Sequence, residues 1–155
     1  MLTQRAKRLL DQSGATYETL PHRKAFTAQG VAAAVHVSGW QMAKVLVVRA
    51  PTDALVMVVL PASCRLDLQT LARVLHMKEV SLVPEEEITR LFPDCETGAM
   101  PPFGNLYGLP VYVDACFPHA RDIAFQAGNH QEVVKMPYAE FERLVNPVVA
   151  EFCLH

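Results

Sequence analysis

Two apolar runs separated by a short turn constrain the fold more than any other feature of the sequence. Residues 44–50 and 55–60 are almost continuous in valine, leucine, methionine and alanine. Pro51, Thr52 and Asp53 between them have the composition of a tight turn. The runs lack the apolar–polar alternation of a sheet with one solvated face. We therefore predict a β-hairpin of central strands that are buried on both faces.

Lys44 stands at the front of the first run, where a buried strand begins. Such a lysine has two explanations: it is the solvated first residue of the strand, or it is held there for a partner or a substrate. The first explanation is the more common, and this stretch alone favours it. The rest of the chain must decide between the two.

Short helices and short strands alternate along the rest of the chain. Apolar residues at helical spacing follow Thr3, Thr27 and Asp67, which are suited to cap three helices, and Pro84 and Pro137 each open another. This order predicts an α+β (mixed α/β) fold around one sheet. Further strands are predicted at residues 17–20, 79–83, 111–114, 123–127 and 133–136, and a terminal turn at 148–154.

Composition excludes several classes of protein. The formal net charge is −2 and the sequence pI is about 6.3, so any contact with nucleic acid has to be local. No apolar run reaches the roughly 20 residues of a membrane span, and no signal-peptide pattern opens the sequence. The cysteines form no C-x-x-C pair, which favours reduced thiols in the cytoplasm; they are Cys64, Cys95, Cys116 and Cys153.

Common catalytic motifs are absent from the sequence. There is no H-x-x-x-H or C-x-x-C spacing for zinc, no G-x-S-x-G nucleophile elbow and no glycine-rich phosphate loop. We therefore expect neither a metal nor a cofactor. Cys64 is the best-placed thiol for nucleophilic catalysis, although a buried inert cysteine is the more common case.

Three features remain: Lys44, the loop 98–104 and the turn 127–130. The loop, Gly-Ala-Met-Pro-Pro-Phe-Gly, is apolar and rigid, and the turn reads Ala-Gly-Asn-His. Each feature has an ordinary explanation by itself. The glycines of the loop and of the turn can serve backbone geometry alone, and the histidine of the turn can be an exposed turn residue. Their combination in one chain is more specific than any of them alone.

In these residues the chain resembles the YbaK/ProX-like aminoacyl-tRNA deacylases, which include the editing domain inserted in many bacterial prolyl-tRNA synthetases. The resemblance spans nearly the whole chain. It rests on His22, Thr27, Lys44 to Val47, Val59 to Ala62, Asp67-Leu68, Leu71-Ala72, Gly98 to Gly104, Val111 to Asp114 and Ala127 to His130.

The resemblance implies a single editing-type domain over residues 1–155, with a central mixed, partly barrel-like sheet flanked by short helices. It implies a metal-independent hydrolase that needs no cofactor and acts on the ester of a mischarged tRNA, with Lys44 as the catalytic residue. The expected substrate-binding residues are His22, Phe26, Thr27, Met42, Gly98, Pro101, Phe103, Gly128, Asn129 and His130.

We expect Lys44 to act as an electrostatic anchor rather than as a general base, and backbone N–H groups of Gly98 or Gly128 to stabilise the oxyanion. The family lysine is usually followed by threonine or another polar residue, whereas Val45 follows it here. That departure leaves the amino acid specificity open. His130 is expected to border the pocket for the amino acid side chain.

The expected substrate is alanine or cysteine esterified to tRNA-Pro, with prolyl-tRNA synthetase as a candidate partner and a monomer or weak dimer as the assembly. Two alternatives remain open. A non-catalytic module would bind aminoacyl-tRNA or its synthetase and protect the ester. A thiol hydrolase would depend on Cys64 and not on Lys44.

Overall fold

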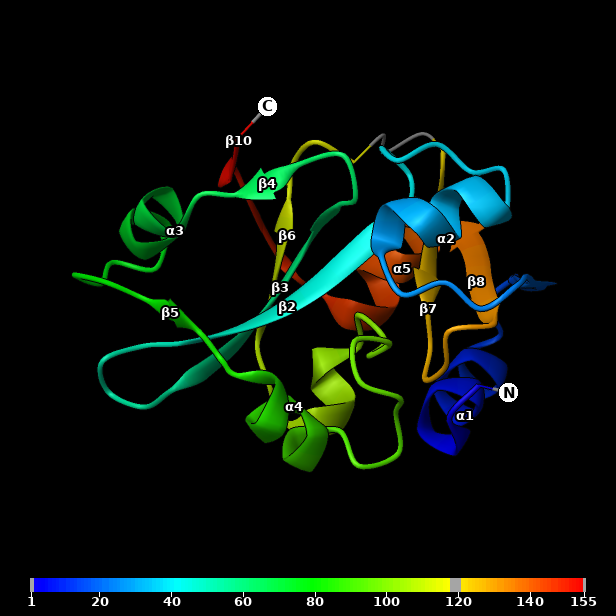
Figure 1. The fold of residues 1–155 in the computed structure, drawn as a ribbon, viewed down its shortest axis with the longest axis horizontal. Coiled ribbons are helices and arrows are strands. Elements are labelled where there is room, and N and C mark those ends of the chain that lie inside the picture. Colours follow the sequence, from blue (N-terminus) through cyan, green and yellow to red (C-terminus); the bar gives the residue numbers. More distant parts are fainter. Residues whose placement is uncertain (1, 118–120, 155) are drawn as a thin grey trace.

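The computed structural model describes residues 2–117 and 121–154 of the chain (Figure 1). The helices are α1 (Gln4–Ser13), α2 (Ala28–Ala34), α3 (Leu68–Val74), α4 (Glu85–Leu91), the 3-10 helix η1 (Gly104–Tyr107) and α5 (Tyr138–Val145). The strands are β1 (Glu18–Pro21), β2 (Ala43–Arg49), β3 (Leu55–Pro61), β4 (Arg65–Leu66), β5 (Ser81–Leu82), β6 (Val111–Asp114), β7 (Asp122–Gln126), β8 (Glu132–Pro137), β9 (Val148–Ala150) and β10 (Cys153–Leu154).

The predicted hairpin is present and lies in the largest sheet. β2 pairs antiparallel with β3 from Ala43 opposite Pro61 to Arg49 opposite Leu55. The sheet order is β5-β2-β3-β6-β9, and β6 runs parallel to both of its neighbours, so the sheet is mixed. β3 is buried almost throughout, whereas β2 is partly exposed in its middle because only the two-residue β5 covers its outer edge. The prediction of burial on both faces therefore holds for β3 more than for β2.

A second sheet, in the order β1-β8-β7, carries a helix on each face (Figure 1). Side chains alternate between the faces of a strand. Ala124 and Val133 pack in one apolar cluster with Val31 of α2, and Phe125 and Val134 pack in another with Phe141 of α5. The alternation of β7 and β8 thus assigns α2 to one face of the sheet and α5 to the other.

The two sheets meet at the start of β2. A single parallel bridge joins Met42 to Ala124, and a two-stranded sheet of β4 and β10 completes the strand pairing. None of the sheets in the described residues closes on itself. The predicted α+β class is confirmed. The prediction of one sheet is wrong, because the strands of the described residues divide among three open sheets.

Local signals in the sequence placed the helix starts correctly. Thr3 Oγ1 accepts a hydrogen bond from Ala6 N–H, and Thr27 Oγ1 accepts one from Gly30 N–H. Asp67 Oδ1 accepts hydrogen bonds from two N–H groups of the first turn of α3. Each cap satisfies backbone donors that the helix itself leaves unpaired.

The prediction of a terminal turn over residues 148–154 is wrong. Residues 148–150 form β9, parallel to β6, and residues 153–154 form β10 against β4. The buried Asp114 side chain holds this segment, because its Oδ2 accepts a hydrogen bond from Phe152 N–H at 2.9 Å. The pairing partners lie more than 35 residues away in the sequence, so no local pattern could indicate them.

Gly128 makes a close approach between the turn 127–130 and the start of α1. Its φ is +121°, and a Cβ atom there would lie 2.4 Å from Thr3 Cγ2. Thr3 N–H donates to Ala127 O at 2.9 Å at the same contact. The glycine therefore lets the turn and the helix cap lie against each other.

We expect Gly128→Ala to lower the free energy of unfolding by about 3 kcal/mol or more, through the positive φ and the overlap with Thr3. Gly14→Ala is the matched control, because Gly14 also has a positive φ (+72°) but a Cβ there would meet nothing within 4 Å. That substitution should cost about 1 kcal/mol. Urea denaturation measures both. Equal losses would contradict the close approach.

Candidate functional site

Lys44 lies near the start of β2, between two cavities. Its Nζ donates a hydrogen bond to the backbone oxygen of Cys64 at 2.6 Å. The other two Nζ protons have no acceptor, and no carboxylate pairs with the ammonium, among residues 2–117 and 121–154. One cavity, of about 200 Å³, separates Lys44 from the loop at Gly98. The other, of about 680 Å³, lies toward Cys64 and Arg65.

Burial lowers the pKa of Lys44 below its ordinary value of 10.5. Removal of a charged group from water disfavours the charged form, and the positive charge of Arg65 acts in the same direction. The hydrogen bond to Cys64 satisfies only part of the ammonium. Lys44 is therefore a half-buried cation with donors left for a ligand.

The smaller cavity brings together segments that are distant in the sequence. The loop before α2, the strand β2, the loop after α4 and the end of β7 all contribute to its walls. Three of the residues predicted for the site line it: Phe26, Lys44 and Gly98. The other lining residues are Ala28, Ala43, Val45, Leu46, Met100 and Gln126.

Gly98 and Gly128, the two predicted oxyanion donors, differ in what their N–H groups do. The Gly128 N–H donates to Ala99 O at 2.8 Å and is occupied. The Gly98 N–H has no hydrogen-bond acceptor among the described residues. Gly98 also has a φ of +86°, which favours glycine, and lines the cavity with Lys44. Of the two, Gly98 is the donor that remains available.

His130 lies behind the cavity wall rather than in the cavity. It is 3% exposed, and the ring of Phe26 covers it with the two centroids 4.9 Å apart. Its Nε2 lies 2.7 Å from Thr97 O, and its Nδ1 lies 3.2 Å from Gln126 Nε2. A carbonyl oxygen only accepts, so Nε2 carries a proton, and Nδ1 then accepts from the amide nitrogen. These contacts fit a neutral imidazole.

The remaining predicted residues lie around this centre in structural positions. Met42 and Phe103 are fully buried in apolar clusters. Pro101 is buried as well. Thr27 caps α2, and Asn129 Oδ1 accepts hydrogen bonds from two N–H groups of its own turn. The side chain of His22 lies outside the cavity, with its Nδ1 2.5 Å from Arg23 O. Its Nε2 is enclosed and has no hydrogen-bond partner in the described part of the chain.

Gln126 is the polar lining residue that the sequence analysis missed. It lies opposite Val133 in the β7–β8 pair, so it faces the same side of the sheet as α2. A signal was present, because Gln126 is the single polar residue in the otherwise apolar stretch from Ile123 to Ala127. Met100 was within the predicted loop but was not selected.

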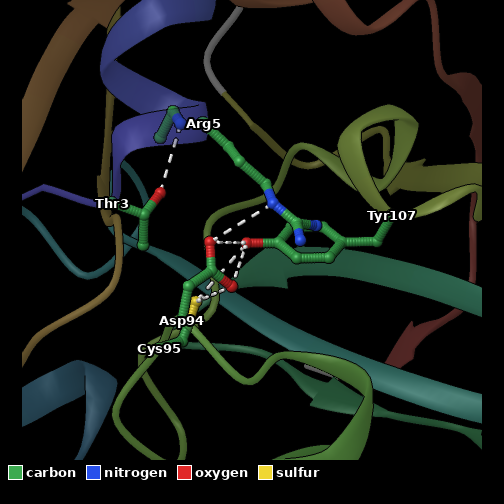
Figure 2. A network of polar contacts seen from close by, with 6 residues as sticks. Thr3, Arg5, Asp94, Cys95 and Tyr107 are labelled. Carbon is green, nitrogen blue, oxygen red and sulfur yellow. Dashed lines mark hydrogen bonds and ion pairs between the residues drawn. The ribbon is translucent and has the colours of Figure 1, made fainter.

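A polar network fixes the loop that carries Gly98 (Figure 2). Asp94 accepts hydrogen bonds from Tyr107 Oη at 3.0 and 3.2 Å, and its Oδ2 lies 3.6 Å from Arg5 Nε. The Arg5 guanidinium also lies over the Tyr107 ring, 4.9 Å from its centroid. Burial, together with the nearby Cys95 and Asp94, raises the pKa of Tyr107 well above its usual range, so the phenol remains a donor. The network ties α1 and η1 to the start of the loop.

Ser63 and Cys64 line the larger cavity, and of the two only Ser63 is exposed. Cys64 is 1% exposed, and the atom that it presents to Lys44 is its backbone oxygen. No group of three or more His, Cys, Asp or Glu side chains is placed to hold a metal ion in the part of the chain that the structure describes. No helix within those ranges combines the length and apolar character of a membrane span.

Residues 22–144 match the profile of the aminoacyl-tRNA editing domain, the YbaK family. The chain belongs to this family. Membership implies deacylase activity toward aminoacyl-tRNA, and the matched range contains Lys44, the loop 98–104 and the turn 127–130. The resemblance found in the sequence is therefore confirmed. A comparison of this chain with curated proteins found no match.

Two solved structures share the fold of this editing domain. The hypothetical protein APE2540 superimposes with a TM-score of 0.86 at 19% identity, covering 97% of this chain and 100% of its own. A candidate trans-editing enzyme for prolyl tRNA synthetase superimposes with a TM-score of 0.84 at 21% identity, covering 98% of this chain and 96% of its own. Identities this low establish the shared fold alone.

The hydrogen bonds of His130 predict its tautomer at neutral pH. We expect the Nε2–H form, because Thr97 O requires a donor and the Gln126 amide nitrogen requires an acceptor. The ¹⁵N shifts of the ring, read from long-range ¹H–¹⁵N spectra, distinguish the two tautomers. The exposed His76 is a control and should show a mixture. An Nδ1–H form of His130 would contradict the assignment.

Proposed function

We propose that this chain hydrolyses the ester of a mischarged tRNA that carries a small amino acid, alanine or cysteine on tRNA-Pro. One observation carries the proposal: Lys44 and Gly98 line the same cavity of about 200 Å³. Lys44 is a cation, and the Gly98 N–H is a donor with no acceptor within residues 2–117 and 121–154. That volume is below the roughly 300–1,000 Å³ of sites for drug-sized ligands. It suits the amino acid end of the substrate, with the tRNA outside.

The proposed reaction is direct attack by water. The water oxygen bonds to the ester carbonyl carbon, and the terminal ribose hydroxyl leaves with a proton, which gives the free amino acid and deacylated tRNA. The Lys44 ammonium and the Gly98 N–H stabilise the negative charge that develops on the carbonyl oxygen. The ester is already activated, so the reaction proposed needs no metal and no covalent intermediate.

The small cavity supports selection by size. A synthetase discriminates poorly against an amino acid that is smaller than its own, because one methylene is worth only about 1 to 3 kcal/mol. A second site that admits only small side chains supplies the missing selectivity. The similarity to a candidate trans-editing enzyme for prolyl tRNA synthetase favours a prolyl system, with the synthetase as a partner in the cytoplasm.

The acceptor end of the tRNA has a suitable approach beside Phe26. This ring is 71% exposed at the cavity, and the exposed Arg23 and Lys24 precede it in the chain. An exposed aromatic ring can stack on the terminal adenine, and basic side chains attract phosphates. Arg5 and Lys7 of α1 suit this role less, because each lies within 4 Å of an aspartate oxygen.

A binding module remains the second candidate, and one observation favours it. The residues that line the cavity include no carboxylate, hydroxyl, thiol or imidazole that could activate water. A protein of this kind would bind the aminoacyl end and protect the ester from hydrolysis.

We expect Lys44→Met to lower kcat/KM for hydrolysis of alanyl-tRNA-Pro by about 100-fold or more, because it removes the cation while leaving the side-chain size similar. Lys7→Met, an exposed position in α1, is the control and should leave the rate unchanged. The assay measures release of labelled amino acid from a panel that carries alanine, cysteine or proline.

Each outcome of that assay separates the candidates. Hydrolysis of the small esters that depends on Lys44 supports the enzyme. Slower loss of the ester than in buffer alone would establish the binding module instead. Full activity of Lys44→Met, combined with inactivation by Cys64→Ala, would favour the thiol hydrolase.

A further inference from the structure

The side-chain oxygen of Gln126 is a hydrogen-bond acceptor available to a ligand in the cavity. Gln126 is 9% exposed and lines the cavity with Lys44. Its amide nitrogen contacts His130, but its Oε1 accepts no hydrogen bond among the described residues. The oxygen is not among the fully enclosed atoms that lack a partner, so it is accessible. A mostly buried residue with an accessible oxygen presents that oxygen to the cavity.

The orientation of the Gln126 amide follows from the histidine behind it. Thr97 O fixes the His130 proton on Nε2, so Nδ1 accepts and the amide has to turn its nitrogen toward the ring. His130 is itself anchored, because its backbone N–H donates to Glu96 Oε2 at 3.2 Å. The contacts that link Thr97, His130 and Gln126 therefore determine that the oxygen of the Gln126 amide, and not its nitrogen, faces the cavity.

Among the side chains of the cavity wall, that of Lys44 is a hydrogen-bond donor and that of Gln126 offers an acceptor. Lys44 and the Gly98 N–H donate, and the other side chains of the wall, Gln126 aside, are apolar. An aminoacyl ester offers a carbonyl oxygen, which accepts, and an α-amino group, which donates. The two donors match the carbonyl, which leaves the Gln126 oxygen for the amine.

We propose that Gln126 Oε1 binds the α-amino group of the substrate, and that His130 is a positioning residue that holds the Gln126 amide in this orientation. This inference rests on the proposed function, since it places an aminoacyl ester in the cavity. It assigns Gln126 the recognition of aminoacyl over other acyl groups. A buried acceptor discriminates strongly against a ligand that leaves it unpaired.

Binding of two analogues that cannot be hydrolysed tests the assignment. Both are derivatives of 3′-amino-3′-deoxyadenosine, in which a 3′ amide replaces the ester. One carries an alanyl group, and the other carries a propionyl group, in which hydrogen replaces the amino group. Calorimetry or NMR titration gives the affinities. The propionyl compound is smaller, so a loss of affinity for it cannot arise from a clash.

We expect the unmodified chain to bind the alanyl compound about tenfold to hundredfold more tightly than the propionyl one, the range of a hydrogen bond to a charged group. Gln126→Met should bind both with equal, weak affinity. Gln131→Met, an exposed glutamine in the same turn region, is the control and should keep the preference. Thermal unfolding shows that each variant is folded.

The role of His130 has its own readout. His130→Ala should reduce the ratio of the affinity for the alanyl compound to that for the propionyl compound. In the double variant with Gln126→Met, this ratio should fall no further than in Gln126→Met alone. A purely structural role of His130 would weaken both compounds equally and leave the ratio intact, which would overturn the positioning role.

Equal binding of the two compounds by the unmodified chain, or a preference retained by Gln126→Met, would overturn the inference. Hydrolysis of alanyl-tRNA by the same protein would then still support the proposed function. Conversely, a preference that depends on Gln126 in a chain that protects the ester would support the inference and favour the binding module.

Discussion

The docking of the loop 96–99 against the turn 127–130 is the contact on which the site depends. Glu96 N–H donates to Gly128 O, and Gly128 N–H donates to Ala99 O, both at 2.8 Å. His130 adds its bonds to Thr97 O and to the Glu96 carboxylate. These bonds join two segments about 30 residues apart and leave Gly98 at the cavity.

In this contact Gly128, Gly98 and His130 have different structural roles. Gly128 accommodates the approach of Thr3, and its backbone is fully used by its neighbours. The Gly98 N–H has no hydrogen-bond acceptor among the described residues. A Cβ atom at Gly98 would lie 3.6 Å from the His130 ring. His130 acts as a buried link between the loop and Gln126. These hydrogen bonds hold the loop and its backbone donor in place before a ligand binds, although Glu96 and Thr97 are themselves exposed.

Lys44 depends on tertiary structure in a different way. The β2–β3 hairpin delivers it to the junction of the two sheets, where Met42 bridges to Ala124 of β7. There burial lowers its pKa, and a single carbonyl satisfies part of its charge. An exposed lysine without a partner is still solvated, so its charge costs little free energy. A lysine that is paired with a carboxylate has its charge neutralised and fewer N–H donors for a ligand.

The sequence by itself determined the hairpin, the helix caps at Thr3, Thr27 and Asp67, and the family, because periodicity, capping and motif spacing are local properties. It also predicted Lys44 and Gly98 as site residues, and both line the same cavity. Only the tertiary structure placed Met42 and Phe103 in the core, occupied the Gly128 N–H, brought Gln126 into the cavity and paired the C-terminal strands with β6 and β4. Those outcomes depend on which distant segments pack together, and the side chains of a single segment do not encode its partner.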